Sequence, residues 1–71
     1  PRTARRLRVS FIGAGRMGER HARAFAQLSD LFELAAVHDA EPERARALAA
    51  TLPLTVAPAA EAAIERADVV V

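Results

Sequence analysis

The stretch LRVSFIGAGRMG, residues 7–18, decides the fold of this chain. From Leu7 to Phe11 apolar and polar residues alternate, which is typical of a short β-strand. Two glycines then end the strand, and from Arg16 the apolar residues recur every three or four positions, which predicts a helix that ends at Ser29-Asp30. The helix face predicted to be buried consists of Met17, His21, Ala24, Phe25 and Leu28.

The same alternation of strand and helix continues to the end of the chain. Leu31–Val37 is almost wholly apolar, which indicates a strand buried on both faces of a parallel sheet. Pro42 is well placed as the first residue of a second helix, and Pro53 ends that helix. The remaining predicted elements are a strand at Leu54–Ala57, a short helix at Pro58–Arg66 and a strand at Asp68–Val71.

The order β-α-β-α-β-α-β predicts an α/β fold with a parallel, Rossmann-type sheet and helices on both faces, cut short after the fourth strand. In the usual strand order 3-2-1-4, the first two helices share one face and the third covers the other. We therefore interpret residues 1–71 as an incomplete N-terminal dinucleotide-binding domain with a polar arm at residues 1–6. We also expect an exposed apolar face and a substrate domain outside this chain.

Composition excludes several classes of protein. The chain has 71 residues, 52% of them hydrophobic and 27% charged, which does not fit a disordered tail. It has no cysteine, so it has no disulfide framework, and no apolar run is long enough to span a membrane. The twin-arginine-like string at residues 3–7 is not followed by an export-type apolar segment, which predicts a cytoplasmic protein.

The distribution of charge is uneven along the chain. Residues 1–28 hold seven arginines and one glutamate, a net charge of +6, and residues 29–71 hold three arginines and eight acids, a net charge of −5. The total of +1 argues against a nucleic-acid partner. The basic first part suits an anionic small ligand.

The motif that carries chemistry is G-x-G-x-x-G at residues 13–18, between a strand and a helix. Gly13 permits the tight turn, Gly15 lets a pyrophosphate approach the backbone, and Gly18 lets the helix pack closely on the strand. The backbone N–H groups of Arg16 and Met17 would face the phosphates at the positive end of the helix, and the Arg16 side chain could add a contact.

Asp39 follows the second strand, 26 positions after Gly13. A carboxylate there can accept hydrogen bonds from both hydroxyls of an adenosine ribose and repels a 2′-phosphate, which favours NAD over NADP. Arg44 and Arg46 could partly offset that repulsion, although they are more simply the solvated face of the second helix. Alternatively, Asp39 only caps the turn between strand and helix.

Neither histidine is predicted to bind a metal or act in catalysis. His21 has no acidic residue or second histidine at metal-ligand spacing, so we expect a packed residue with a hydrogen-bonded ring. His38 lies beside Asp39 and contacts either an adenine or solvent. Met17, Phe25 and Leu28 are expected in the core, and no metal site is predicted.

Residues 8–24, RVSFIGAGRMGERHARA, together with FELAAVHD at 32–39, PERA at 42–45 and DVVV at 68–71, resemble the start of the Gfo/Idh/MocA oxidoreductases. The most specific feature is His21 three residues after Gly18. The resemblance implies that Gly13, Gly15, Arg16, Met17 and Gly18 hold the pyrophosphate of NAD, or of NADP, and that Asp39 holds the ribose. The family commonly has Asp-Pro where this chain has Glu41-Pro42.

The resemblance also implies a second domain that binds a sugar, a polyol or a related substrate, hydride transfer between that substrate and the nicotinamide, and a homo-oligomer. The family's catalytic lysine, in a Glu-Lys-Pro segment, lies beyond the fourth strand, and this chain contains no lysine. We therefore expect no catalytic residue in this chain and no activity from it alone.

Two other classes of function remain open from the residues. A methyltransferase that uses S-adenosylmethionine also has a glycine-rich turn after its first strand, although position 17 here is Met where that fold more often has a further glycine. A non-catalytic nucleotide-sensing domain would keep the same turn. Within the enzymes, pyrroline-carboxylate reductase has a similar turn, and His21 argues mildly against it.

Overall fold

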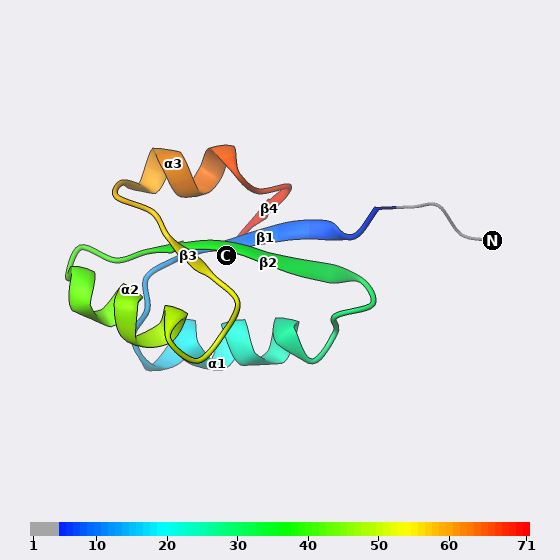
Figure 1. The fold of residues 1–71 in the computed structure, drawn as a ribbon, viewed down its shortest axis with the longest axis horizontal. Helices are drawn as coiled ribbons and strands as arrows, with labels where there is room; N and C mark the ends of the chain where they lie inside the picture. The colour runs from blue at the N-terminus through cyan, green and yellow to red at the C-terminus, as the bar shows by residue number, and fades with distance from the viewer. Residues whose placement is uncertain (1–4) are drawn as a thin grey trace.

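The computed structural model describes residues 5–71, so most of the polar arm expected at residues 1–6 lies outside the described residues. These described residues form one four-stranded sheet and three helices (Figure 1). The elements are β1 (Leu7–Ile12), α1 (Arg16–Ala26), β2 (Phe32–His38), α2 (Pro42–Ala49), β3 (Thr55–Val56), α3 (Ala60–Glu65) and β4 (Val69–Val70).

The strand order is β3-β2-β1-β4 and all neighbours are parallel, which confirms the predicted topology. Helices α1 and α2 lie on one side of the sheet and α3 on the other (Figure 1). Because the strands are parallel, their carboxyl ends meet at one edge, and the turns that follow β1, β2 and β3 lie side by side there. That edge carries the candidate site described below.

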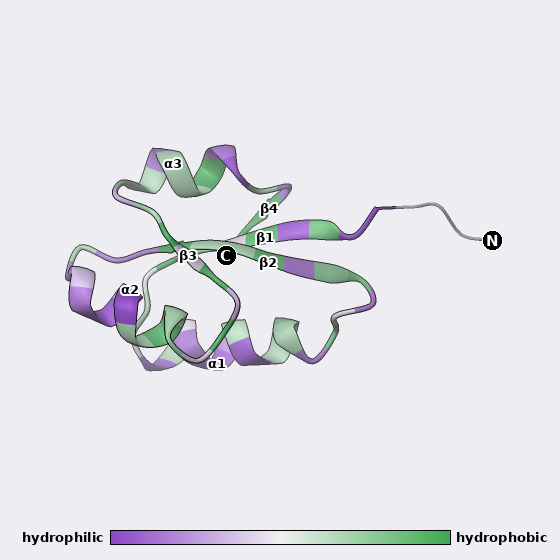
Figure 2. Cartoon of the chain, viewed as in Figure 1, coloured by the Kyte–Doolittle hydropathy of each residue, from purple (hydrophilic) through white to green (hydrophobic). Residues whose placement is uncertain are grey.

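The larger core lies between the sheet and the pair α1 and α2. The strands are mainly green in Figure 2, and α1 and α2 alternate purple and green segments, as amphipathic helices do. Phe11 packs edge to face on Phe25 at 5.9 Å between ring centroids, and Phe25 packs on Phe32 at 4.8 Å. The fully or nearly buried members of this core are Val9, Phe11, Ala22, Leu34, Val37, Ala45, Leu48 and Leu54.

The opposite face of the sheet is built from small residues. Ala36, Ala57 and Ala63 form a second cluster, and the hydroxyl of Ser10 is buried with no hydrogen-bond partner among the described residues. The pairing of β1 with β2 contains a bulge in β2. Val9 pairs with Leu34 but Phe11 pairs with Val37, so β2 has one more residue than β1 between these pairs. The bulge lets Leu34 and Val37, three positions apart, both enter the larger core.

The buried face of α1 differs from the prediction. Met17 and Leu28 are 57% and 48% exposed, and His21 and Ala24 are also exposed, so of the five residues predicted on this face only Phe25 packs on the core. The buried stripe instead contains Ala22, Phe25 and Ala26. Gly18, which approaches the Gly13 carbonyl, lies on this same stripe, four positions before Ala22 and seven before Phe25, so Met17 and His21 face outward.

The element boundaries are tighter than the sequence suggests. Helix α1 ends at Ala26 and α2 at Ala49, and each is followed by a hydrogen-bonded turn. Strands β3 and β4 have only two residues each. The exposed large apolar side chains include Ile12, Val70 and Val71 at the carboxyl edge of the sheet.

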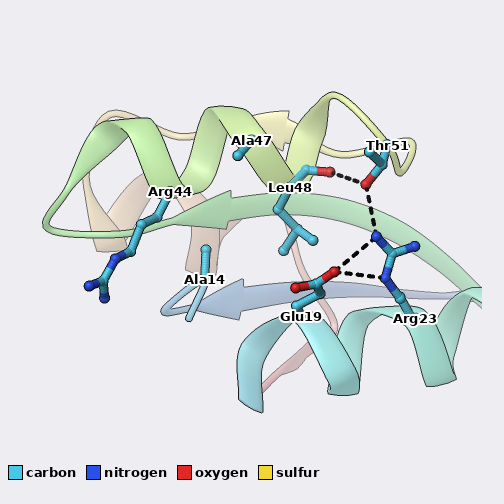
Figure 3. Close-up of a pocket in the computed structure, with 7 residues that line it drawn as sticks. All are labelled: Ala14, Glu19, Arg23, Arg44, Ala47, Leu48 and Thr51. Carbon is cyan, nitrogen blue, oxygen red and sulfur yellow. Dashed lines mark hydrogen bonds and ion pairs between the residues drawn. The ribbon is translucent and has the colours of Figure 1, made fainter. Parts of the chain in front are cut away.

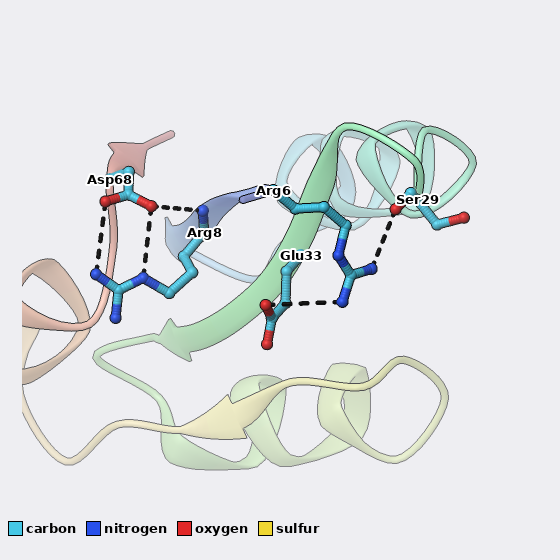
Figure 4. A network of polar contacts seen from close by, with 5 residues as sticks. All are labelled: Arg6, Arg8, Ser29, Glu33 and Asp68. Carbon is cyan, nitrogen blue, oxygen red and sulfur yellow. Dashed lines mark hydrogen bonds and ion pairs between the residues drawn. The ribbon is translucent and has the colours of Figure 1, made fainter. Parts of the chain in front are cut away.

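Charged contacts fasten β1 at its start (Figure 4). The Asp68 carboxylate accepts hydrogen bonds from the backbone N–H of Arg8 at 2.8 Å and from its Nε at 3.4 Å, which joins β4 to β1. These bonds hold the pKa of the Asp68 carboxyl below its ordinary value of 3.8. Arg6 donates to the carbonyl of Ser29 at 3.0 Å and lies 3.7 Å from Glu33, so this part of the predicted arm rests on β2.

Candidate functional site at the glycine-rich turn

The three glycines of the turn are required for three different physical reasons. Gly13 has φ +104°, a conformation that L-residues rarely adopt, and its N–H donates to the carbonyl of His38 at 2.7 Å. At Gly18 a Cβ would overlap the carbonyl oxygen of Gly13 and lie 3.0 Å from its carbonyl carbon. At Gly15 a Cβ would meet only the Arg44 guanidinium, at 3.9 Å. Gly13 is therefore required for its backbone conformation, Gly15 leaves space above the turn, and Gly18 allows α1 to pack closely on the turn.

The start of α1 presents backbone N–H donors that have no partner within residues 5–71. Gly15 is its N-cap residue with φ −76° and ψ −162°, and no side chain caps the helix. The Gly15 carbonyl accepts the N–H of Glu19 at 2.8 Å, which leaves the N–H groups of the first turn, at Arg16 and Met17, directed out of the helix end. Together with the positive end of the helix dipole, these groups suit an anion.

Asp39 lies beside this turn and is already engaged by the backbone. Its Oδ2 accepts the N–H of Ala14 at 2.7 Å, and its Oδ1 accepts the N–H of Glu41 at 2.8 Å. The bonds from Glu41 and Ala14 hold the pKa of the Asp39 carboxyl below its ordinary value of 3.8, so it is ionised at neutral pH. Asp39 therefore caps the turn between β2 and α2 and also fixes the glycine turn, and each oxygen keeps a lone pair for a further donor.

Helix α2 places Arg44 over the glycine turn. A cavity of about 220 Å³ between α1 and α2 is lined by Ala14 and Arg44 at one end and by Glu19, Arg23 and Thr51 at the other (Figure 3). The second end is closed by hydrogen bonds, because Arg23 donates to Glu19 at 3.0 Å and to the Thr51 hydroxyl at 3.4 Å. Only the end with Arg44 meets the turn.

Two further cavities flank the turn at the carboxyl edge of the sheet. The one on the Asp39 side has a volume of about 370 Å³ and lies between the turns that follow β2 and β3. Its lining residues are His38, Asp39, Ala40, Pro42, Ala45, Arg46, Val56, Ala57 and Pro58. The cavity on the other side, about 310 Å³, is lined by Phe11, Ile12, Gly13, Gly15, Met17, Gly18, His21 and Val71. A ligand with two arms joined by phosphates would fit this arrangement of an anion site between two partly apolar hollows.

The structure brings all six residues of the predicted site to one edge of the sheet. Gly13, Gly15, Arg16, Met17 and Gly18 form the turn and the start of α1, and Asp39 lies against Ala14. The predictions of a core position for Met17 and a packed ring for His21 are wrong. Both residues are exposed, and both line the cavity of about 310 Å³. His38 is partly buried, and its Nδ1 lies 3.1 Å from the carbonyl of Ala57, which joins β2 to β3.

The sequence predicts that Arg44 lies near Asp39, where it could offset the repulsion of a phosphate, or simply on the solvated face of the second helix. In the structure its side chain is 55% exposed, and its Nη1 lies 3.9 Å from the point where a Cβ of Gly15 would stand. The sequence does not predict this proximity to the glycine turn. In residues 5–71 no group of three or more metal-ligating side chains lies close enough together to hold an ion. No helix in the same range has the length and apolar character needed to cross a bilayer.

Comparison with known proteins agrees with this geometry. Residues 7–71 match the family model described as the Gfo/Idh/MocA oxidoreductase family with an NAD-binding Rossmann fold. The chain is 43% identical over 47 residues to an inositol 2-dehydrogenase from Acidothermus cellulolyticus, a match that covers 66% of this chain and 14% of the relative.

Two solved structures of the UDP-N-acetylglucosamine 3-dehydrogenase GnnA from Acidithiobacillus ferrooxidans are also similar. They superpose with TM-scores of 0.81 and 0.82 at 33% identity, and each match covers 94% of this chain and 21% of that protein. The chain therefore spans only a small part of the length of the relatives it matches.

Proposed function

The chain belongs to the Gfo/Idh/MocA oxidoreductase family, and from that premise we propose that it is the cofactor-binding portion of a dehydrogenase acting on a sugar, a polyol or a related substrate. The observation that carries the proposal is the pairing of the open glycine turn with Asp39, whose carboxylate lies 2.7 Å from the Ala14 nitrogen. The names of the similar proteins support a sugar-like substrate. The family match does not favour the methyltransferase alternative.

Within this proposal, the chain's own groups bind and orient the cofactor. The N–H groups at Arg16 and Met17 receive the pyrophosphate, and the absence of a side chain at Gly15 lets it approach. The free lone pairs of Asp39 accept the hydroxyls of the adenosine ribose. The adenine occupies the cavity beside Pro42 and Val56, whose walls are largely apolar.

The nicotinamide arm then extends toward the cavity lined by Ile12, Met17 and Val71. When bound, the cofactor supplies the site that accepts or donates a hydride. The exposed apolar side chains of Ile12 and Met17 would exclude water from one side of that ring. The chain's role is therefore to hold the ring in place, and the proton-transfer groups and the substrate pocket belong to a second domain of the whole enzyme, which we expect to be a homo-oligomer.

A titration of NADH into the chain tests this proposal. The chain has no Trp or Tyr, so the fluorescence of NADH reports binding without a protein background. We expect saturable binding that Gly15→Val abolishes and that Asp39→Ala weakens by about tenfold or more, the loss expected when charge-assisted hydrogen bonds are removed. Asp30→Ala removes an equal charge from the exposed turn between α1 and β2 and serves as the matched control.

S-adenosylmethionine is the competitor in this titration. It should leave the NADH signal unchanged, and displacement of NADH by S-adenosylmethionine would move the chain to the methyltransferase class. A variant that retains the circular dichroism spectrum of a folded chain but binds no ligand identifies a site residue. If the folded parent chain binds no NADH, the proposal fails.

A further inference from the structure

Three charged side chains meet at the turn between β2 and α2, and they differ in how firmly they are held. Asp39 is fixed by two backbone N–H groups at 2.7 and 2.8 Å. Arg44 and Glu41 instead contact each other, Nε to Oε1, at 3.5 Å, and their side chains are 55% and 68% exposed. An exposed pair of this length contributes little to stability, so either partner can be drawn away by a ligand.

Arg44 is also directed at the space that a cofactor would use. Its Nη1 lies 3.9 Å from the point where a Cβ of Gly15 would stand, on the open side of the glycine turn. Its charge also acts on the Asp39 carboxylate and favours the ionised form. Arg44 therefore lies between the position proposed for the pyrophosphate and the position proposed for the adenosine ribose.

We propose that the Glu41–Arg44 pair sets the tolerance of this site for an adenosine 2′-phosphate, with Arg44 as the group that binds the phosphate and Glu41 as the group that holds Arg44 back. This inference rests on the proposed dinucleotide site. Asp39 and Glu41 place two carboxylates beside the Arg44 guanidinium, and the Glu41 carboxylate pairs with it. Removing the Glu41 charge removes one of the two groups that repel a phosphate and frees the planar guanidinium for bidentate phosphate binding.

Glu41 directly precedes Pro42, the first residue of α2. It is also the N-cap residue of α2, yet its side chain makes no capping hydrogen bond. Its carboxylate is therefore not needed to start the helix, and Pro42 at the first helical position supplies the required backbone conformation. The Glu41 side chain is free to act on Arg44 without affecting the fold.

The test compares NADH and NADPH binding, each followed by its own fluorescence, in Glu41→Gln, Arg44→Gln and the double variant. Glu41→Gln should tighten NADPH binding by about threefold to fivefold and change NADH binding little, as expected for one surface charge. Arg44→Gln should weaken NADPH binding by about tenfold, the loss of a charge-assisted contact, and NADH binding much less. When Arg44→Gln is already present, the increase in NADPH affinity caused by Glu41→Gln should be at most half of that in the parent chain.

Two variants control for the change of charge alone. Glu43→Gln removes an exposed carboxylate from the first turn of α2, and Arg20→Gln removes an exposed guanidinium from α1. Neither should alter the ratio of the two affinities. Adenosine 2′,5′-bisphosphate, which lacks the nicotinamide arm, should follow the NADPH pattern when it displaces bound NADH.

The outcomes distinguish failure of this inference from failure of the proposed dinucleotide-binding function. Loss of NADH binding from the folded parent chain would contradict the dinucleotide site itself. Normal NADH binding with an unchanged affinity ratio in Arg44→Gln would overturn the role of Arg44. An equal gain from Glu41→Gln in both backgrounds would show that Glu41 repels the phosphate directly, and would overturn its action through Arg44.

Discussion

Adding a methyl group at Gly18 should lower the stability of the fold, whereas adding one at Gly15 should weaken ligand binding. At Gly18 the new Cβ would lie 3.0 Å from the carbonyl carbon of Gly13 and closer still to its oxygen, and neither atom can rotate away. Overpacking of this kind costs about 3 kcal/mol, and the better helix propensity of alanine returns about 1 kcal/mol. Gly18→Ala should therefore lower the free energy of unfolding by about 2 kcal/mol, or roughly 8–16 °C in melting temperature for a chain of this size.

At Gly15 the same methyl group meets only the end of a flexible side chain, Arg44, at 3.9 Å. The φ of −76° suits any L-residue, so Gly15→Ala should lower the free energy of unfolding only by the cost of an alanine N-cap, about 0.5 kcal/mol. The methyl group fills the space above the turn, so Gly15→Ala should weaken NADH binding by about tenfold while the fold survives. Thermal unfolding and NADH titration of both variants check the contrast.

Either result could refute the reasoning behind this pair. A Gly18→Ala chain as stable as its parent would mean that α1 does not press on the turn through Gly18. A Gly15→Ala chain that binds NADH as tightly as its parent would mean that the open space above Gly15 does not belong to the ligand.

Three further predictions concern stability. Phe11 is 1% exposed, so Phe11→Ala should lower the free energy of unfolding by about 3–5 kcal/mol. Met17 is 57% exposed, so Met17→Ala should change that free energy by no more than about 0.5 kcal/mol. Urea unfolding of both variants tests which residues form the core. Because the folded-state pKa of Asp68 is lowered, its stabilising contribution is complete above the ordinary value of 3.8 and is lost as the pH falls through the lowered value. Asp68→Asn should therefore lower the melting temperature at pH 6 more than at pH 3, and an equal loss at both would contradict the bond to Arg8. Arg23→Ala removes the hydrogen bond between α1 and Thr51 and should lower the free energy of unfolding by about 0.5–1 kcal/mol without changing NADH affinity. A change in NADH affinity would mean that the end of the 220 Å³ cavity lined by Arg23 belongs to the binding site.

The sequence is most informative where local chemistry leaves few alternatives. The run from Leu7 to Gly18 predicts strand, turn and helix, because alternation, glycines and helical spacing follow one another without overlap. The apolar run before Asp39 then requires a parallel partner strand, and the order β3-β2-β1-β4 follows from right-handed crossovers. These local signals are strong enough to predict that Asp39 lies beside the glycine turn.

The sequence misleads where packing distance, and not hydrophobicity, decides which side chain is buried. The apolar character of Met17 and Leu28 suggests an inner face, but α1 contacts the turn through Gly18, and this rotates Ala22 into the core. The bulge in β2 has no local marker either, since Ala35 and Ala36 are ordinary strand residues and the extra residue is visible only in the register with β1. Both errors arise from contacts between elements, which periodicity within one element does not contain.

The candidate site shows the same division between local and spatial information. Asp39 is a typical ribose acceptor by position, yet its first partners are the N–H groups of Ala14 and Glu41, so the fold fixes it before any ligand arrives. Arg44 is an ordinary solvated residue by position, yet α2 brings its Nη1 to within 3.9 Å of the point where a Cβ of Gly15 would stand. A rigid acceptor beside a loosely held donor is a sound basis for adjusting cofactor choice, because the strength of the Glu41 contact can change without moving the turn. Discrimination between NAD and NADP in this chain should therefore depend on the exposed Glu41–Arg44 pair more than on the backbone contacts of Asp39.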